Sequence, residues 1–170
     1  WVRKHKKFTK FGSKNVLIGE DHPILGKSIG LMIEKYEKDL TDLYQKEQFE
    51  EVVCFFEYYG KNSFAGRHDP NESQTVTLID INIYKHGMMY PNEFIKLHVN
   101  VEIPDILHIG NFTKDVEDQV KNGTLERMTF EGVVCKTIKP IKNGYPPGLW
   151  KVKNTAWIQK VKEFCKGKNS

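Results

Sequence analysis

The chain has 170 residues, of which 39% are hydrophobic, and its formal net charge is +4. This size and composition predict one globular domain over residues 1–170, and the sequence contains neither a membrane-length apolar run nor a signal peptide. The three cysteines are widely spaced and form no Cys-x-x-Cys pair, which argues against a disulfide framework or a zinc site. We therefore expect a monomer in the reducing cytoplasm with no membrane partner.

The first part of the chain predicts extended segments followed by an amphipathic helix. Residues 1–18 mix apolar and basic side chains and fit a hairpin that turns at Gly12 and Ser13. Ser28 is a candidate cap for a helix that runs to about Lys46. Apolar side chains recur in it at helical spacing and predict core packing: Ile29, Met32, Ile33, Tyr36, Leu40, Leu43 and Tyr44.

Two strands are expected in the middle of the chain. Residues 51–59 are apolar from Val52 to Phe56, which predicts a central strand covered on both faces, and Glu57 interrupts this run. Residues 60–66 leave the strand as a loop in which Phe64 is expected to enter the core. Residues 75–84 form the next predicted strand.

The second half predicts a mixture of short helices and strands. Pro91 begins a short helix, residues 106–109 read as a brief strand, and Thr113 caps a further helix that ends before Gly123. Two strands then flank an irregular loop at residues 140–148. The last helix starts near Asn154 and has an apolar side made of Trp157, Ile158, Val161 and Phe164. The predicted class is α+β, with antiparallel sheets flanked by helices.

The chemistry of the chain concentrates in its last two strands. Residues 131–136 read Glu-Gly-Val-Val-Cys-Lys, and Lys151 and Lys153 are separated by one valine. In an extended strand this spacing directs both ammonium groups to the same face. Two lysines beside a carboxylate suit an anionic ligand, such as a nucleoside phosphate with a divalent metal. The alternative is a solvated strand face.

These residues also carry a resemblance to a known superfamily. Residues 131–136 resemble motif IV of the covalent nucleotidyltransferases, which include ATP-dependent DNA ligases, RNA ligases and mRNA capping enzymes. Residues 151–153 resemble motif V. Residues 56–60, which read Phe-Glu-Tyr-Tyr-Gly, and the following residues 62–66 resemble motif III. The three motifs occur in the family's order, and the chain is most similar to the phage-type RNA ligases.

The resemblance implies a nucleotidyltransferase (adenylation) domain of a polynucleotide ligase. We expect no OB domain after it, since 17 residues follow Lys153. Such enzymes use ATP to join 5′-phosphate and 3′-hydroxyl ends through ligase–AMP and nucleic acid–adenylate intermediates. In that scheme Glu131 holds Mg²⁺ or Mn²⁺, while Lys151 and Lys153 neutralise charge on the α-phosphate. Glu57 hydrogen-bonds the ribose. Lys136 supports the phosphate site or forms a salt bridge at the strand end.

The chain departs from the family pattern at two places. Ile79 stands where the family has an aromatic residue that stacks on the purine. No Lys-x-Asp-Gly motif is present, and Lys27 lies at the start of the predicted helix, a poor place for the nucleophile. Family spacing puts that lysine before Trp1, so we expect a fragment that cannot adenylate itself.

Lys10 or Lys14 falls near the place of a basic residue that binds substrate or pyrophosphate phosphates in the family. Two other functions stay open. One is a non-catalytic nucleotide- or nucleic-acid-binding module that lacks the lysine, and the other is a capping-type guanylyltransferase core. The sequence does not choose between RNA and DNA as the substrate.

Overall fold

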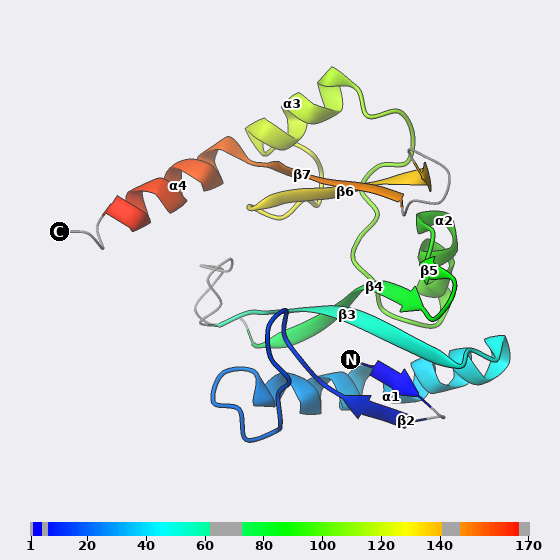
Figure 1. Ribbon diagram of the computed structural model, residues 1–170. Coiled ribbons are helices and arrows are strands. Elements are labelled where there is room, and N and C mark those ends of the chain that lie inside the picture. Colours follow the sequence, from blue (N-terminus) through cyan, green and yellow to red (C-terminus); the bar gives the residue numbers. More distant parts are fainter. Residues whose placement is uncertain (1, 5–6, 62–72, 141–146, 167–170) are drawn as a thin grey trace. The chain divides into compact units, whose positions relative to one another are not determined.

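The computed structural model describes residues 2–4, 7–61, 73–140 and 147–166 (Figure 1). The expected loop at residues 62–66 with Phe64, and most of the loop at 140–148, lie outside these ranges. The chain divides into two compact units, Trp1–Pro104 and Asp105–Ser170. Both contain antiparallel strands and helices, so the protein is α+β. The single domain over residues 1–170 stays a prediction.

The first unit is built on a sheet in the order β2-β1-β3-β4-β5, in which every pairing is antiparallel. Its strands are β1 (Val2–Lys4), β2 (Lys7–Lys10), β3 (Glu51–Tyr59), β4 (Thr75–Ile83) and β5 (Gly87–Met88). The predicted central position of β3 is confirmed. After β2 the chain turns back at Ser13, but the pairing there is a single bridge between Gly12 and Leu17.

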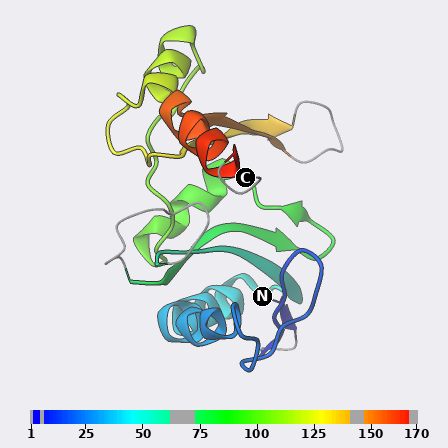
Figure 2. The ribbon, with the colours of Figure 1, turned by 90° about the vertical axis from the view of Figure 1, so that its left-hand side faces the viewer.

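Helix α1 (Gly26–Glu47) packs along one face of this sheet (Figures 1 and 2). Five residues of its predicted apolar stripe are buried in the core: Ile29, Met32, Tyr36, Leu40 and Tyr44. They pack with the inward side chains of β3 and β4, which are Val52, Cys54, Val76, Leu78 and Ile81. Ile33 is 36% exposed, so its assignment to the core is wrong. It lies beside the buried arc of the helix.

The start of α1 differs from the prediction, because Ser28 is not its cap. Leu25, three residues before Ser28, is at the cap position, and the ring Nδ1 of His22 accepts a hydrogen bond from the Leu25 N–H. The Gly26 N–H is bonded to the His22 carbonyl. Ser28 is buried in the first turn, where its hydroxyl donates to the Leu25 carbonyl at 2.6 Å. The His22 ring therefore satisfies the N–H of Leu25, the residue directly before the helix, which has no side-chain cap of its own.

The other face of the β3–β4 pair is less covered than expected. Phe55 is 41% exposed and Glu57 is exposed, so burial of β3 on both faces is wrong for the described part of the first unit. Side chains alternate along a strand, and Cys54, Phe56 and Tyr58 face α1. Phe55 and Glu57 therefore point away from the helix. The apolar run concealed this alternation because Phe55 is itself hydrophobic.

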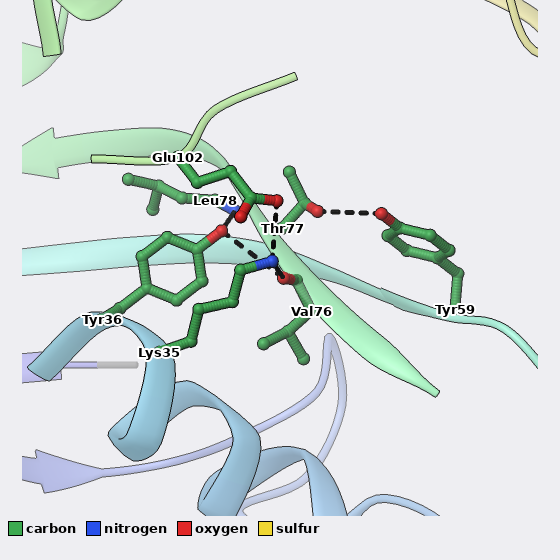
Figure 3. Close-up of polar contacts among 7 residues, drawn as sticks. All are labelled: Lys35, Tyr36, Tyr59, Val76, Thr77, Leu78 and Glu102. Carbon is green, nitrogen blue, oxygen red and sulfur yellow. Dashed lines mark hydrogen bonds and ion pairs between the residues drawn. The ribbon is translucent and has the colours of Figure 1, made fainter. Parts of the chain in front are cut away.

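Side chains cover part of the outer edge of β4, at positions where no described strand pairs with it (Figure 3). β5 pairs only with Asn82 and Ile83. Earlier in β4, the Tyr36 hydroxyl accepts from the Leu78 N–H at 3.2 Å and donates to the Val76 carbonyl at 3.4 Å. Lys35 donates to the same carbonyl at 3.1 Å and forms an ion pair of 2.7 Å with Glu102. Helix α1 thus supplies the hydrogen bonds that a neighbouring strand would make.

The first unit ends with α2 (Pro91–Phe94) and the 3₁₀ helix η1 (Ile95–Val99). Pro91 is in the first turn of α2, as predicted. Phe94 inserts into the core, as do Val101 and Ile103 of the segment that follows η1. None of the helices among the described residues has the length and apolar character needed to cross a bilayer.

The second unit consists of the hairpin β6 (Gly132–Pro140) and β7 (Pro147–Lys153) with two helices, α3 (Lys114–Asn122) and α4 (Thr155–Lys166). The predicted ends of α3 are confirmed: Thr113 caps it by accepting from the Val116 N–H, and Gly123 follows it with φ +71°. Val120 of α3 and Val152 of β7 are buried. The strand expected at residues 106–109 is absent from this described segment, and Ile109 is 69% exposed.

Candidate functional site

The basic residues of the second unit gather on one face of the β6–β7 hairpin. The register pairs Gly132 with Lys153, Val134 with Lys151 and Lys136 with Leu149. Residues directly opposite each other in a sheet share a face, so Lys136, Lys151 and Lys153 all lie on the same side. Val152 between the two β7 lysines points the other way and is buried. The prediction that Lys151 and Lys153 point to the same face of the strand is therefore confirmed.

Glu131 lies beside this face and is joined to Lys153. The Lys153 ammonium donates to the Glu131 carboxylate, and the two side chains are 27% and 30% exposed. Lys151 is exposed, and it has no ion-pair partner among the described residues. A partly exposed ion pair contributes about 1 kcal/mol or less to stability. The pair is weak enough for a charged ligand to compete with either partner.

Gly132 is required for Glu131 to reach Lys153. Its φ of +134° is unfavourable for any residue with a side chain, and a Cβ here would overlap the carbonyl oxygen of Val152. The close approach of the two backbones is secured by the Asn154 N–H, which donates to the Glu131 carbonyl at 3.1 Å. Glycine thus lets β6 begin directly against the end of β7.

The sequence did not predict that α4 takes part in this site. The Trp157 ring lies under the Lys153 ammonium, with the nitrogen 4.7 Å from the ring centroid. Asn154 is buried, and its side-chain oxygen accepts from the Ala156 N–H at 2.8 Å, so it caps α4 immediately after Lys153. Trp157 had been assigned to an apolar helix side. Its spacing of four residues from Lys153 was the available signal.

In the first unit, Glu57 and Ile79 lie on the sheet face that points away from α1. Glu57 is opposite Thr77, and the pairing shifts between Phe55 and Phe56 so that Ile79 is an extra residue on β4. Such a bulge lets Ile79 and Asp80 both fall on the outward side, between the buried Leu78 and Ile81. The structure therefore places the two predicted nucleotide contacts of this unit on one face.

The tentative phosphate-binding residues lie elsewhere in the first unit. Lys10 ends β2 and Lys14 is in the turn after it, and both side chains are exposed. Lys27, rejected as a nucleophile, is in the first turn of α1. Cys135 lies on β6 within the motif IV segment, and burial raises the pKa of its thiol. The thiol therefore stays protonated near neutral pH and is a poor nucleophile.

At the hairpin, the Glu131 carboxylate is the candidate ligand for a divalent metal. Among the described residues there is no group of three or more His, Cys, Asp or Glu side chains that could hold a metal ion. Mg²⁺ is commonly bound through one or two carboxylates together with substrate phosphates and water. Glu131, released from Lys153, fits this type of coordination with a nucleotide as the other ligand.

No protein-family model, curated protein or solved structure matches the chain.

Proposed function

We propose that the chain is the adenylation domain of an ATP-dependent polynucleotide ligase that acts on nucleic acid with 5′-phosphate and 3′-hydroxyl ends. The observation that supports this most directly is the gathering of Lys136, Lys151 and Lys153 on one hairpin face beside Glu131. Three ammonium groups at this spacing suit the phosphates of ATP. RNA is the expected nucleic acid, from the resemblance to phage-type RNA ligases.

Each residue has a distinct part in this proposal. Lys151 and Lys153 bind the α-phosphate and offset the charge that grows on it, and Lys136 extends the same basic face. Glu131 is the metal ligand, and bound Mg²⁺ or Mn²⁺ would supply further neutralisation of phosphate charge. Glu57 orients the ribose, and Ile79 makes an aliphatic contact with the base. Lys10 and Lys14 are candidate contacts to substrate phosphates.

The adenylation step forms a bond between a lysine nitrogen and the α-phosphorus, with pyrophosphate as the leaving group. The 170 residues contain no Lys-x-Asp-Gly sequence that would supply this lysine. The sealing step does not use it: the 3′-hydroxyl oxygen bonds to the 5′-phosphorus, the bond to AMP breaks, and the hydroxyl proton goes to solvent. The described residues therefore act in nucleotide binding and in sealing.

Nucleotide binding is the first test. The chain is titrated calorimetrically with ATP and Mg²⁺, and Lys151→Ala and Lys153→Ala are each expected to weaken binding about tenfold or more, since each removes a charged hydrogen bond. Lys162→Ala is the matched control, because Lys162 is exposed on α4, and it should bind as the unchanged chain does. If both test variants keep full affinity, the lysine face is not a nucleotide site.

Sealing of a pre-adenylated strand is the second test. A strand bearing 5′-adenylate and a 3′-hydroxyl acceptor are incubated with the chain and Mg²⁺, and the joined product is resolved on a gel. The ligase proposal expects joining that depends on Glu131 and Lys153. ATP binding without joining would favour a non-catalytic binding module. Tighter binding of GTP than ATP would favour a capping-type guanylyltransferase.

A further inference from the structure

The ammonium group of Lys153 lies between two partners of different character. The Glu131 carboxylate accepts its hydrogen bond, and the indole of Trp157 faces it with 4.7 Å between the nitrogen and the ring centroid. Both partners come from the second unit: Glu131 directly precedes β6, and Trp157 is in the first turn of α4. The lysine is held from two sides, and only one of its partners carries charge.

The position of Trp157 relative to Lys153 is fixed by the way α4 begins. In Figure 1 this helix follows directly from β7. Asn154 joins the two elements: its N–H donates to the Glu131 carbonyl, its side chain caps α4, and its own carbonyl accepts from the Ile158 N–H at 3.1 Å. Trp157 is four residues after Lys153. The indole is therefore brought under the ammonium by the backbone.

A second contact ties α4 to the segment that carries Glu131. The ammonium of Lys160 lies 5.4 Å from the ring centroid of Phe130, the residue directly before Glu131. Lys160 is one helical turn beyond Trp157, so successive turns of α4 meet the hairpin end through a cation and an aromatic ring. These contacts join α4 to the end of the hairpin beside Glu131.

A phosphate ligand at this face must change the pairing of Lys153. The phosphate competes with Glu131 for the ammonium, and a divalent cation competes with Lys153 for the carboxylate. Once the pair opens, a lysine with four methylene groups is free to take up many conformations. An aromatic face can keep the ammonium in place without competing with the phosphate. It uses none of the three N–H donors of the ammonium in a conventional hydrogen bond.

We propose that Trp157 is a positioning residue that keeps the Lys153 ammonium on the phosphate-binding face after Glu131 has exchanged partners. This rests on the proposed nucleotide site at the hairpin. The indole is needed for its aromatic face, so Phe retains part of its effect at this position and an aliphatic residue does not. Trp157 acts only through Lys153 and has no effect of its own on the nucleotide.

A double-mutant cycle on ATP affinity tests the proposal. Trp157→Leu is expected to weaken ATP binding by about three- to tenfold, and Trp157→Phe by about twofold. In a Lys153→Ala background, Trp157→Leu should produce no further loss. Trp150→Leu is the matched control, since Trp150 lies on the opposite face of the hairpin, paired with Cys135, and it should leave the affinity unchanged.

The outcomes separate this inference from the function on which it rests. If Trp157→Leu weakens binding equally with and without Lys153, its role is structural and the proposal is overturned. If Lys153→Ala weakens binding and Trp157→Leu does not, the inference fails while the nucleotide site stands. If Lys153→Ala has no effect while Lys151→Ala weakens binding, the inference also fails and the nucleotide site stands. If neither lysine variant has an effect, both fail.

A measurement without substitution covers the case in which Trp157→Leu does not fold. The ring current of the indole is expected to shift the NMR signals of the Lys153 ε-methylene protons upfield. They should stay upfield when ATP and Mg²⁺ are added. Return of these signals to ordinary lysine positions on saturation would mean that the ammonium leaves the ring, which overturns the proposal.

Discussion

Removal of one hydroxyl, in Tyr36→Phe, should measurably destabilise the first unit. Tyr36 is buried, and its hydroxyl accepts a hydrogen bond from the Leu78 N–H at 3.2 Å. It also donates to the Val76 carbonyl, which keeps a hydrogen bond from Lys35 in the variant. The cost is therefore that of one buried backbone donor left unsatisfied, about 1–3 kcal/mol of unfolding free energy.

Urea unfolding followed by circular dichroism measures this change, with a parallel thermal melt. For a chain of this size a loss of about 2 kcal/mol lowers the melting temperature by roughly 4–8 °C. Tyr58→Phe is the control, because Tyr58 is half-buried on β3 and its hydroxyl has no hydrogen-bond partner among the described residues. A Tyr36→Phe variant as stable as Tyr58→Phe would refute the role given to this hydroxyl.

The same variant has a characteristic pH dependence. Burial raises the pKa of the Tyr36 phenol above its ordinary value of 10.0. Below about pH 10 the phenol is protonated in both the folded and unfolded states, and its contribution to stability is complete. Above that pH the unfolded state loses the proton first, so stability falls as the pH rises through the folded pKa. The stability difference between the unchanged protein and Tyr36→Phe should therefore be constant below about pH 10 and shrink as the pH rises above it.

Three further substitutions test local features by urea unfolding. Gly132→Ala should cost about 2 kcal/mol or more, because φ is +134° and the new Cβ meets the Val152 carbonyl; wild-type stability would contradict the close approach. Gly30→Ala is its counterpart inside α1, where no described atom lies within 4 Å of the added Cβ, and it should gain about 0.5–1 kcal/mol. Thr113→Ala should cost about 1 kcal/mol, since its side chain caps α3 through the Val116 N–H, and an unchanged midpoint would deny the cap that role.

The elements that the sequence predicted well are those whose signals are local. The apolar spacing from Ile29 to Tyr44 fixes a helix face within a few turns, and Thr113 with Gly123 marks both ends of α3. The Lys-Val-Lys alternation needs only an extended strand to place Lys151 and Lys153 together. These inferences do not depend on which distant segment packs nearby.

The errors arose where a distant partner decides the outcome. The run at residues 106–109 has the composition of a strand, but the described structure offers it no ladder partner. The bulge at Ile79 depends on the register between β3 and β4, which two separate strand patterns do not reveal. Trp157 fits an apolar helix stripe equally well whether or not a cation lies against its ring.

The side chains that close the edge of β4 also affect how copies of this protein meet. An exposed strand edge is a template on which an extended segment of another molecule adds, the first step toward ordered aggregates. On this edge the Val76 carbonyl and the Leu78 N–H are already engaged by Lys35 and Tyr36. An incoming chain would have to displace a buried phenol to bond to these two groups, so Tyr36 of α1 hinders strand addition at this part of β4.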